Sequence, residues 1–200
     1  MPQLRRLVFA VLAMCLALAP VRALADDVAP PAGMKGDVLT WMKDAESKLG
    51  QLAEAMPEGK YSWRPAKDVR SAGEVYMHVA AANFGIPGFM GVKPPEGFDF
   101  NTFEKSQTKK ADIQKTLKDS FAHVEKAWMD TPESDLDTQI DLMGRKMTKR
   151  AAFLLLLSHM HEHLGQSIAY ARSNDVVPPW TAAQNARLKE ATEQKGGDKK

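Results

Sequence analysis

The stretch that decides the fold is KRAAFLLLLSHMHEHLGQSIAYAR, residues 149–172. Thr148 precedes it as an N-cap, and Asn174 followed by Pro178 and Pro179 ends it, so we predict a helix over these residues. The stretch is thoroughly apolar from Phe153 to Leu157, and three histidines follow at positions 159, 161 and 163. A helix of this composition is expected to lie inside a helical domain.

The spacing of the histidines indicates a metal site. Successive helical residues rotate by about 100°, so His163 lies about 40° from His159 and one turn further on. Two imidazoles at this spacing can bind one ion, whereas His161 lies on roughly the opposite side and is a poor third ligand. Ala152 and Leu155 share the face of the pair, so we expect this face to be inward. Imidazoles there carry a desolvation cost that a metal ion would offset.

Two further segments have the residue spacing of amphipathic helices. Apolar residues at alternating spacings of three and four lie on one face of a helix. The stripes are Val38, Met42, Ala45, Leu49, Leu52 and Met56 in one segment, and Ile113, Leu117, Phe121, Val124 and Trp128 in the other. Pro57 ends the first of these helices and Pro132 closes the second.

A capping box predicts another helix between these two. Ser71 is followed three residues later by Glu74, which is the pattern of a helix start. We expect this helix to continue to about Phe84, where Gly85 stops it. Residues 85–105 are rich in glycine and proline in their first half and are expected to form a long crossing loop.

These elements predict an all-α fold, a four-helix bundle over residues 37–180. The chain shows no convincing series of strands and no internal repeat. The segment 134–147 stays open between a turn and a short strand around Thr138 to Leu142. The long connection between the second and third helices favours a crossover over simple up-down wiring.

The N-terminal segment has the composition of a cleavable signal peptide, residues 1–25. Arg5 and Arg6 precede an apolar run from Leu7 to Leu18, and Ala23-Leu-Ala25 supplies a small-residue cleavage site. The apolar run is too short for a comfortable membrane span, so we expect no stable membrane insertion after cleavage. The protein is therefore predicted to be periplasmic or secreted. Residues 26–36 are expected to form a linker, and the polar tail, residues 181–200, to be disordered.

Removal of this segment changes the charge and the cysteine content. The whole chain carries a formal net charge of +2, and the mature chain would carry −1, because Arg5, Arg6 and Arg22 lie in the segment and no acidic residue does. We therefore expect no nucleic-acid partner. The single cysteine, Cys15, also lies there, so the mature chain would offer no thiol as a metal ligand or nucleophile.

His78 is the natural third ligand of the His159/His163 pair. It shares a helical stripe with Val75 and Ala82, so it should face the core, where ligands from facing helices converge in a bundle. Three imidazoles with the remaining positions open form a catalytic type of metal site. Two alternatives stay open: a hydrogen-bonded core histidine, or a solvated polar patch. A fifth histidine, His123, is interpreted as structural or solvent-facing.

Two stretches together resemble the DinB-like (damage-inducible) metalloprotein family. They are YSWRPAKDVRSAGEVYMHVAAAN, residues 61–83, and HMHEHLGQ, residues 159–166. That family combines a Trp-x-Pro loop and a capped helix ending in a histidine with a later His-x-x-x-His-x-Gly-Gln helix, and the similarity covers about residues 35–180.

The resemblance implies a bundle with up-down-down-up wiring and a divalent ion, zinc or nickel, at His78, His159 and His163. Family members often form dimers, so a homodimer is expected. Some are thiol-dependent transferases or isomerases, a role that export away from cytosolic thiol pools places in doubt.

Two further side chains are candidates for catalysis. Gln166 lies about 20° from His159 and two turns on, where it could orient water or a substrate, or bond within the core. Glu162 leans toward the histidine stripe and could act as a base, although a surface position is the plainer reading. An H-E-x-x-H motif is absent from the sequence, which argues against a zincin-type metalloprotease.

Three functions remain open from the sequence. The first is a metal-dependent hydrolase or group transferase that acts on a small molecule. The second is a non-catalytic module that binds zinc, nickel or copper, since Met77 and Met160 adjoin the histidines. The third is a structural bundle whose histidines have no present role.

Overall fold

The computed structural model describes residues 31–197 of the chain. The predicted signal peptide, residues 1–25, lies outside the described residues, as do residues 26–30 of the predicted linker. Its last three residues, 34–36, are already helical, because α1 begins at Met34. Within the described range, no helix is both long and apolar enough to cross a membrane.

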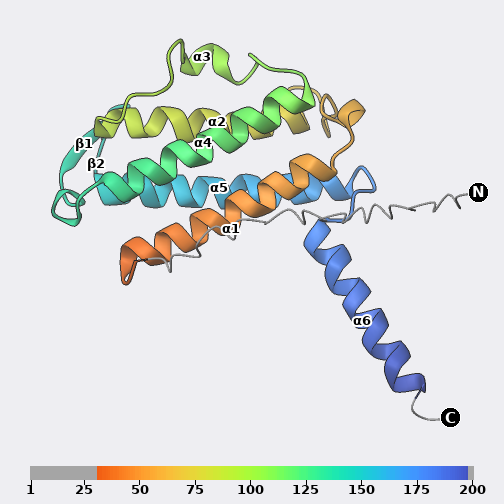
Figure 1. Ribbon diagram of the computed structural model, residues 1–200. Coiled ribbons are helices and arrows are strands. Elements are labelled where there is room, and N and C mark those ends of the chain that lie inside the picture. The colour runs from red at the N-terminus through yellow and green to blue at the C-terminus, as the bar shows by residue number, and fades with distance from the viewer. Residues whose placement is uncertain (1–30, 198–200) are drawn as a thin grey trace, which may run out of the picture.

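Four long helices form the body of the molecule (Figure 1). They are α1 (Met34–Ala55), α2 (Ala72–Gly85), α4 (Lys110–Asp130) and α5 (Lys149–Arg172). Helices α1 and α2 each pack against both α4 and α5, so the four helices enclose one core. The prediction of an all-α fold is confirmed.

The predicted apolar stripes are buried along their whole length. All six stripe residues of α1 and all five of α4 belong to the hydrophobic core. On α5, Ala152 and Phe153 are buried, but Leu155 is 36% exposed, contrary to the expected inward stripe. The histidine face of α5 therefore lies at the edge of the core rather than at its centre.

The loop before α2 is tied closely to that helix. Ser71 and Glu74 form the expected capping box, with the Ser71 hydroxyl accepting from the Glu74 N–H and the Glu74 carboxylate accepting from the Ser71 N–H. The short 3-10 helix η1 (Glu58–Lys60) leads into the buried Tyr61, whose hydroxyl donates to the Ala53 carbonyl at 2.7 Å. These bonds fix the position at which α2 begins, and therefore the position of His78 along the helix.

A two-stranded hairpin precedes α5. Strand β1 (Gln139–Leu142) pairs antiparallel with β2 (Arg145–Thr148), in the segment where a turn or strand was expected. The two residues between the strands, Met143 and Gly144, have φ of 53° and 84°, as a two-residue hairpin turn requires. The second strand was not predicted. The short helix η3 (Glu133–Asp135) joins α4 to the hairpin.

The connection between α2 and α4 is more structured than a plain loop. It begins with the 3-10 helix η2 (Ile86–Met90), and residues 91–109, here called the strap, contain the short helix α3 (Phe100–Phe103). The strap is anchored by an aromatic cluster in which Phe84 of α2 contacts Phe98 and Phe103, and Phe98 contacts Phe100 and Phe103. This anchoring places Glu104, the next residue of the strap, beside α2.

The C-terminal tail was predicted to be disordered, whereas the structure shows a helix over most of its length. Helix α6 (Pro179–Gly197) occupies it. Proline is favoured in the first turn of a helix, and the residues that follow are rich in alanine and other strong helix formers. Figure 1 shows α6 projecting away from the four-helix body. Beyond the packing of Trp180, helix propensity accounts for this element.

Candidate metal centre

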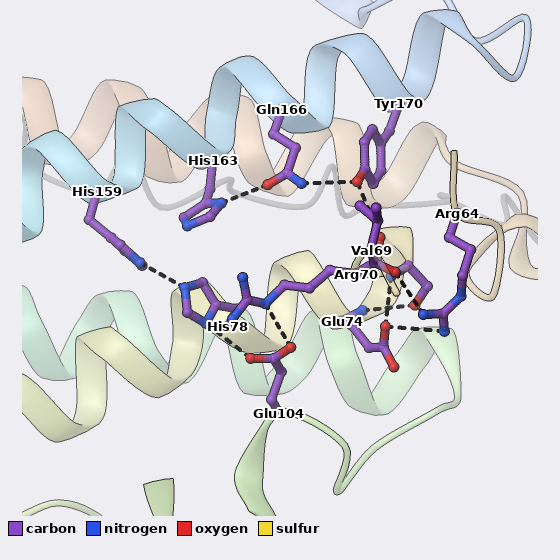
Figure 2. A network of polar contacts seen from close by, with 11 residues as sticks. Arg64, Val69, Arg70, Glu74, His78, Glu104, His159, His163, Gln166 and Tyr170 are labelled. Carbon is purple, nitrogen blue, oxygen red and sulfur yellow. Dashed lines mark hydrogen bonds and ion pairs between the residues drawn. The ribbon is translucent and has the colours of Figure 1, made fainter. Parts of the chain in front are cut away.

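Three histidines from two helices meet at one point. His78 comes from α2, and His159 and His163 come from α5 (Figure 2). One ring nitrogen from each lies within 4.8 Å of those of the other two. The Nε2 atoms of His78 and His159 are 3.0 Å apart, and the three ring centroids are separated by 4.4 to 4.9 Å. This is a compact cluster that could hold one metal ion.

The strap orients the His78 ring. The Glu104 carboxylate lies 3.0 Å from His78 Nδ1 and accepts a second hydrogen bond, of 2.7 Å, from Arg70 Nε. With its proton on Nδ1, the neutral His78 ring turns an Nε2 lone pair toward the other two histidines. Carboxylate–histidine pairs of this kind fix the tautomer of metal ligands.

A second set of bonds orients His163, which is buried. Its Nδ1 lies 2.8 Å from Gln166 Oε1, and Gln166 Nε2 donates to the Tyr170 hydroxyl at 2.9 Å. The Tyr170 hydroxyl in turn donates to the Arg70 carbonyl at 3.2 Å. Gln166 thus leaves the His163 Nε2 free for a ligand, rather than reaching the centre itself.

These bonds form one circuit. It runs from His163 through Gln166 and Tyr170 to the backbone of Arg70, and returns from the Arg70 side chain through Glu104 to His78 (Figure 2). The circuit joins α5, the loop before α2, the strap and α2. Two of the three imidazoles are therefore held from outside the cluster by groups from separate parts of the chain.

The environment favours the neutral form of His78 and His159. Burial, together with the neighbouring His163, His78 and Arg70, lowers the pKa of His159 to about 3. Burial, Arg70 and His163 also lower the pKa of His78, against the opposing effect of Glu104. The His78–Glu104 contact is thus a hydrogen bond to a neutral ring rather than an ion pair. Neutral imidazole is the form that binds a metal.

The cluster meets the requirements of a divalent cation. Zinc binds imidazole nitrogens at about 2.0–2.1 Å. Because the three ring nitrogens lie within 4.8 Å of one another, small ring rotations would let them bind one ion. When the rings of His78 and His159 are both neutral, only one of their facing Nε2 atoms can donate a hydrogen bond to the other. The other nitrogen of His159, Nδ1, is buried with no partner among the described residues. A cation would accept both facing lone pairs at once, so the donor set fits.

Several candidate residues stay outside the cluster. Glu162 is exposed and lines a separate hollow with Trp41 and His161, so the structure does not bring it to the three imidazoles. His161 Nδ1 lies 3.0 Å from the Leu157 carbonyl, and its ring packs edge-on against Trp41. His123 packs against Phe84, and burial lowers its pKa.

An open hollow of about 610 Å³ adjoins the circuit. Its lining includes Arg70, Glu104 and Gln166, and beyond them Arg64, Asp68, Val69, Glu74 and Lys105. A small molecule that approaches the imidazoles from this side meets charged side chains first.

The sequence did not indicate Glu104, Arg70 or Tyr170 as parts of the site. Glu104 lies in an irregular segment, and no spacing rule links it to His78. Tyr170 lies four residues after Gln166 on the expected inward face, which was a usable signal for their hydrogen bond.

Comparisons with known proteins agree with this architecture. A sequence model of the DinB superfamily matches residues 42–167. The chain is 30% identical over 134 residues to the uncharacterized protein YjoA of Bacillus subtilis (strain 168), an alignment that spans 61% of this chain and 79% of YjoA.

Solved structures share the fold. A DinB-like protein from Bacillus cereus superposes with a TM-score of 0.63 at 19% identity, covering 73% of this chain and 95% of that one. The DinB-like YjoA of Bacillus subtilis gives 0.56 at 23%, covering 70% and 94%. A conserved protein from Enterococcus faecalis gives 0.60 at 14%, covering 71% and 97%. At these identities the likeness concerns the fold alone.

Proposed function

The chain belongs to the DinB superfamily, and from this premise we propose that it is a metalloprotein holding one divalent cation with His78, His159 and His163. The observation that carries the proposal is the convergence of three imidazoles, two of them held by partners on their outer nitrogens. Without a metal, His78 and His159 share a single hydrogen bond, whereas a cation would be bound by all three rings at once.

Zinc or nickel is the favoured ion. Imidazole ligands suit zinc, nickel and copper, and the described part of the chain contains no cysteine. Copper is the alternative that the adjoining Met77 and Met160 raised, but both side chains are fully buried in the core. Their burial is accounted for by packing.

The reaction class that this centre supports is hydrolysis or group transfer on a small molecule. A divalent ion bound there would act as a Lewis acid that polarises a substrate oxygen or activates water or a thiol. The other residues of the site orient the ligands and set the local charge. Glu104 and Gln166 hold two of the rings, and Arg70 places a positive charge at the edge of the site. The competing proposal is a module that binds the metal without catalysis.

Metal analysis tests the proposal. The purified mature chain is expected to carry close to one zinc or nickel per molecule by mass spectrometry. His163→Ala should lose the metal, whereas His161→Ala, a neighbouring histidine outside the cluster, should retain it. A His163→Ala variant with full metal content would refute the site.

A substrate panel separates catalysis from binding. Esters, amides and thiol-transfer substrates are assayed with the metal-loaded chain, after chelation and after reloading. Activity that chelation abolishes and metal restores supports the enzyme, and its absence across the panel supports the binding module.

We also propose that the protein acts outside the cytoplasm. The proposal rests on the arrangement of Arg5, Arg6 and the apolar run that follows them. The expected mature N-terminus is Asp26, and N-terminal sequencing of the protein recovered from a cell fraction checks it. Recovery of the intact chain from the cytoplasm alone would contradict export.

A further inference from the structure

We propose that Arg70 binds an oxyanion of the substrate, so that the metal centre acts on small molecules that carry a carboxylate or a phosphate. The inference rests on the proposed function, because it assigns a substrate class to the same centre. It begins with the unused hydrogen-bonding capacity of one guanidinium group.

Arg70 is anchored at one end only. Its Nε donates to Glu104 at 2.7 Å, and among residues 31–197 its terminal nitrogens have no hydrogen-bond partner. The side chain is 40% exposed, so these nitrogens are accessible from the hollow. Arg64, the other arginine of the hollow, differs: its two terminal nitrogens contact the Val69 carbonyl at 2.7 Å and Glu74 at 3.2 Å.

The position of Arg70 indicates what its free terminal nitrogens would bind. The carboxylate that accepts from Arg70 Nε also contacts His78 Nδ1, and Figure 2 shows the Arg70 side chain extending toward the His78 ring. A fixed positive charge beside a cation site disfavours metal binding unless an anion lies between the two. Glu104 offsets part of this repulsion, and a bound oxyanion would offset the rest.

The charge of the hollow favours the same class of ligand. Three basic and three acidic side chains line it. Two of the acids are already engaged, since Glu74 belongs to the capping box and Glu104 holds His78. A divalent ion would add two positive charges, so the loaded site would be positive overall. Lys105, which has no ion-pair partner among the described residues, could contact a second anionic group.

The geometry of the guanidinium group further limits the chemical class of the ligand. The planar fork of arginine matches a carboxylate or a phosphate with two parallel hydrogen bonds, and with Nε occupied the terminal pair stays available for this geometry. A neutral amide or alcohol would gain much less. We therefore expect organic acids or phosphate esters to be preferred over neutral substrates.

Calorimetric titration of the zinc-loaded chain tests this assignment. The probes are acetate, methylphosphonate and the neutral acetamide, and zinc content and zinc affinity are measured for each variant. Arg70→Gln should weaken binding of the anionic probes by about ten- to a hundredfold, the range for a hydrogen bond to a charged group. Arg172→Gln, the removal of an exposed arginine at the far end of α5, should leave binding unchanged.

The conservative variant separates charge from geometry. Arg70→Lys retains the charge and loses the fork, so binding of the anionic probes should fall by less than in Arg70→Gln but remain measurably weaker than in wild type. Acetamide binding should be the same in all of these proteins. The stronger of the two anionic probes identifies the substrate as an organic acid or a phosphate ester.

The outcomes distinguish the two proposals. A wild-type chain that binds no zinc overturns the metal site and with it this inference. A chain that binds zinc, but takes anionic probes no better than acetamide or equally well after Arg70→Gln, overturns the role of Arg70 alone. If Arg70→Gln itself loses zinc, the comparison of zinc-loaded Arg70→Lys with wild type decides, and equal binding of the anions overturns the inference.

Discussion

The two oriented imidazoles obtain their partners in different ways. Gln166 lies three residues after His163 on the same helix, so this contact is local and follows from helical geometry. Glu104 lies 26 residues after His78, and the contact exists only because the strap returns to α2. The orientation of His78 therefore depends on tertiary structure, and that of His163 on secondary structure.

Loss of the Glu104 carboxylate should weaken the metal site without removing a ligand. We predict that Glu104→Ala lowers metal affinity by about ten- to a hundredfold, the usual effect of deleting a partner of a metal-binding histidine. Competition with a chromogenic chelator measures the change. Glu162→Ala, which removes an exposed glutamate outside the cluster, is the control and should bind metal as wild type does. Equal affinities for the two variants would show that Glu104 does not support His78.

Much of the centre could be foreseen at this scale, but not all of it. The meeting of His78 with the α5 pair followed from helical spacing and from the family resemblance. Arg70 and Glu104 could not be foreseen, because a side chain in an irregular segment has no periodicity that would indicate its direction. Glu162 is exposed, which agrees with the plainer of its two readings; the sequence left both open because an angle of about 60° from a stripe can lead either to the core edge or to solvent.

At the scale of the elements, burial periodicity predicted the long helices well. The stripes of α1 and α4 coincide with the core because each faces two other helices. The method failed for α6, which has no apolar stripe and packs little, so nothing distinguished its sequence from a frayed tail. Beyond the packing of Trp180, helix propensity accounts for α6, and a burial pattern does not reveal propensity.

The packing of the strap on α2 can be tested at a single glycine. A Cβ at Gly85 would overlap the Phe100 ring, and that ring is held by Phe98 with centroids 5.0 Å apart. We predict that Gly85→Ala destabilises the fold by about 1–3 kcal/mol, as overpacking does, and lowers metal affinity because Glu104 follows Phe100 in the strap. Thermal denaturation and chelator competition measure the two effects.

Gly50 supplies the matched control for this substitution. It lies inside α1, where an added Cβ meets nothing within 4 Å. Gly50→Ala should therefore stabilise the chain by about 0.5–1 kcal/mol through helix propensity and leave metal affinity unchanged. A Gly85→Ala variant as stable as Gly50→Ala would contradict the close packing of the strap.

The contact between α1 and α4 should make stability depend on pH. Burial raises the pKa of Glu125 on α4 to about 7, although Lys43 of α1 pairs with it and opposes the change. The folded chain then keeps a proton that the unfolded chain releases from about pH 4.5 upward, so this group lowers stability progressively as the pH rises from about 4.5 to about 7.

Substitution of Glu125 isolates this effect. In Glu125→Gln the titration is absent, so the melting temperature of the variant relative to wild type should rise between pH 5 and pH 8. Asp119→Asn, an exposed position of the same helix paired with Lys115, is the control and should show a nearly constant difference. A constant difference in melting temperature between Glu125→Gln and wild type across this pH range would disprove the raised pKa of Glu125.

At the scale of the whole molecule, the hydrogen-bond circuit divides the chain into a part that serves the centre and a part that does not. Every member of the circuit lies between Arg70 and Tyr170. Val176 and Trp180 still pack against the core, whereas residues 182–194 are exposed throughout. The boundary of the functional unit should therefore fall just after Trp180, inside α6 rather than at its start.

Two truncations locate that boundary. Removal of residues 182–200 should change the melting temperature by no more than about 2 °C and leave the metal content intact, because residues 182–194 are exposed throughout. Removal from Val176 onward also deletes two apolar side chains packed on the core, at about 1.5–3 kcal/mol for a fully buried one. Since 1 kcal/mol shifts the melting temperature of a domain of this size by about 2–4 °C, the longer truncation should lower it by roughly 5–10 °C. Equal melting temperatures for the two truncated chains would mean that Val176 and Trp180 contribute nothing to the core. A loss of metal in the shorter truncation would mean that α6 supports the metal centre through contacts outside the circuit.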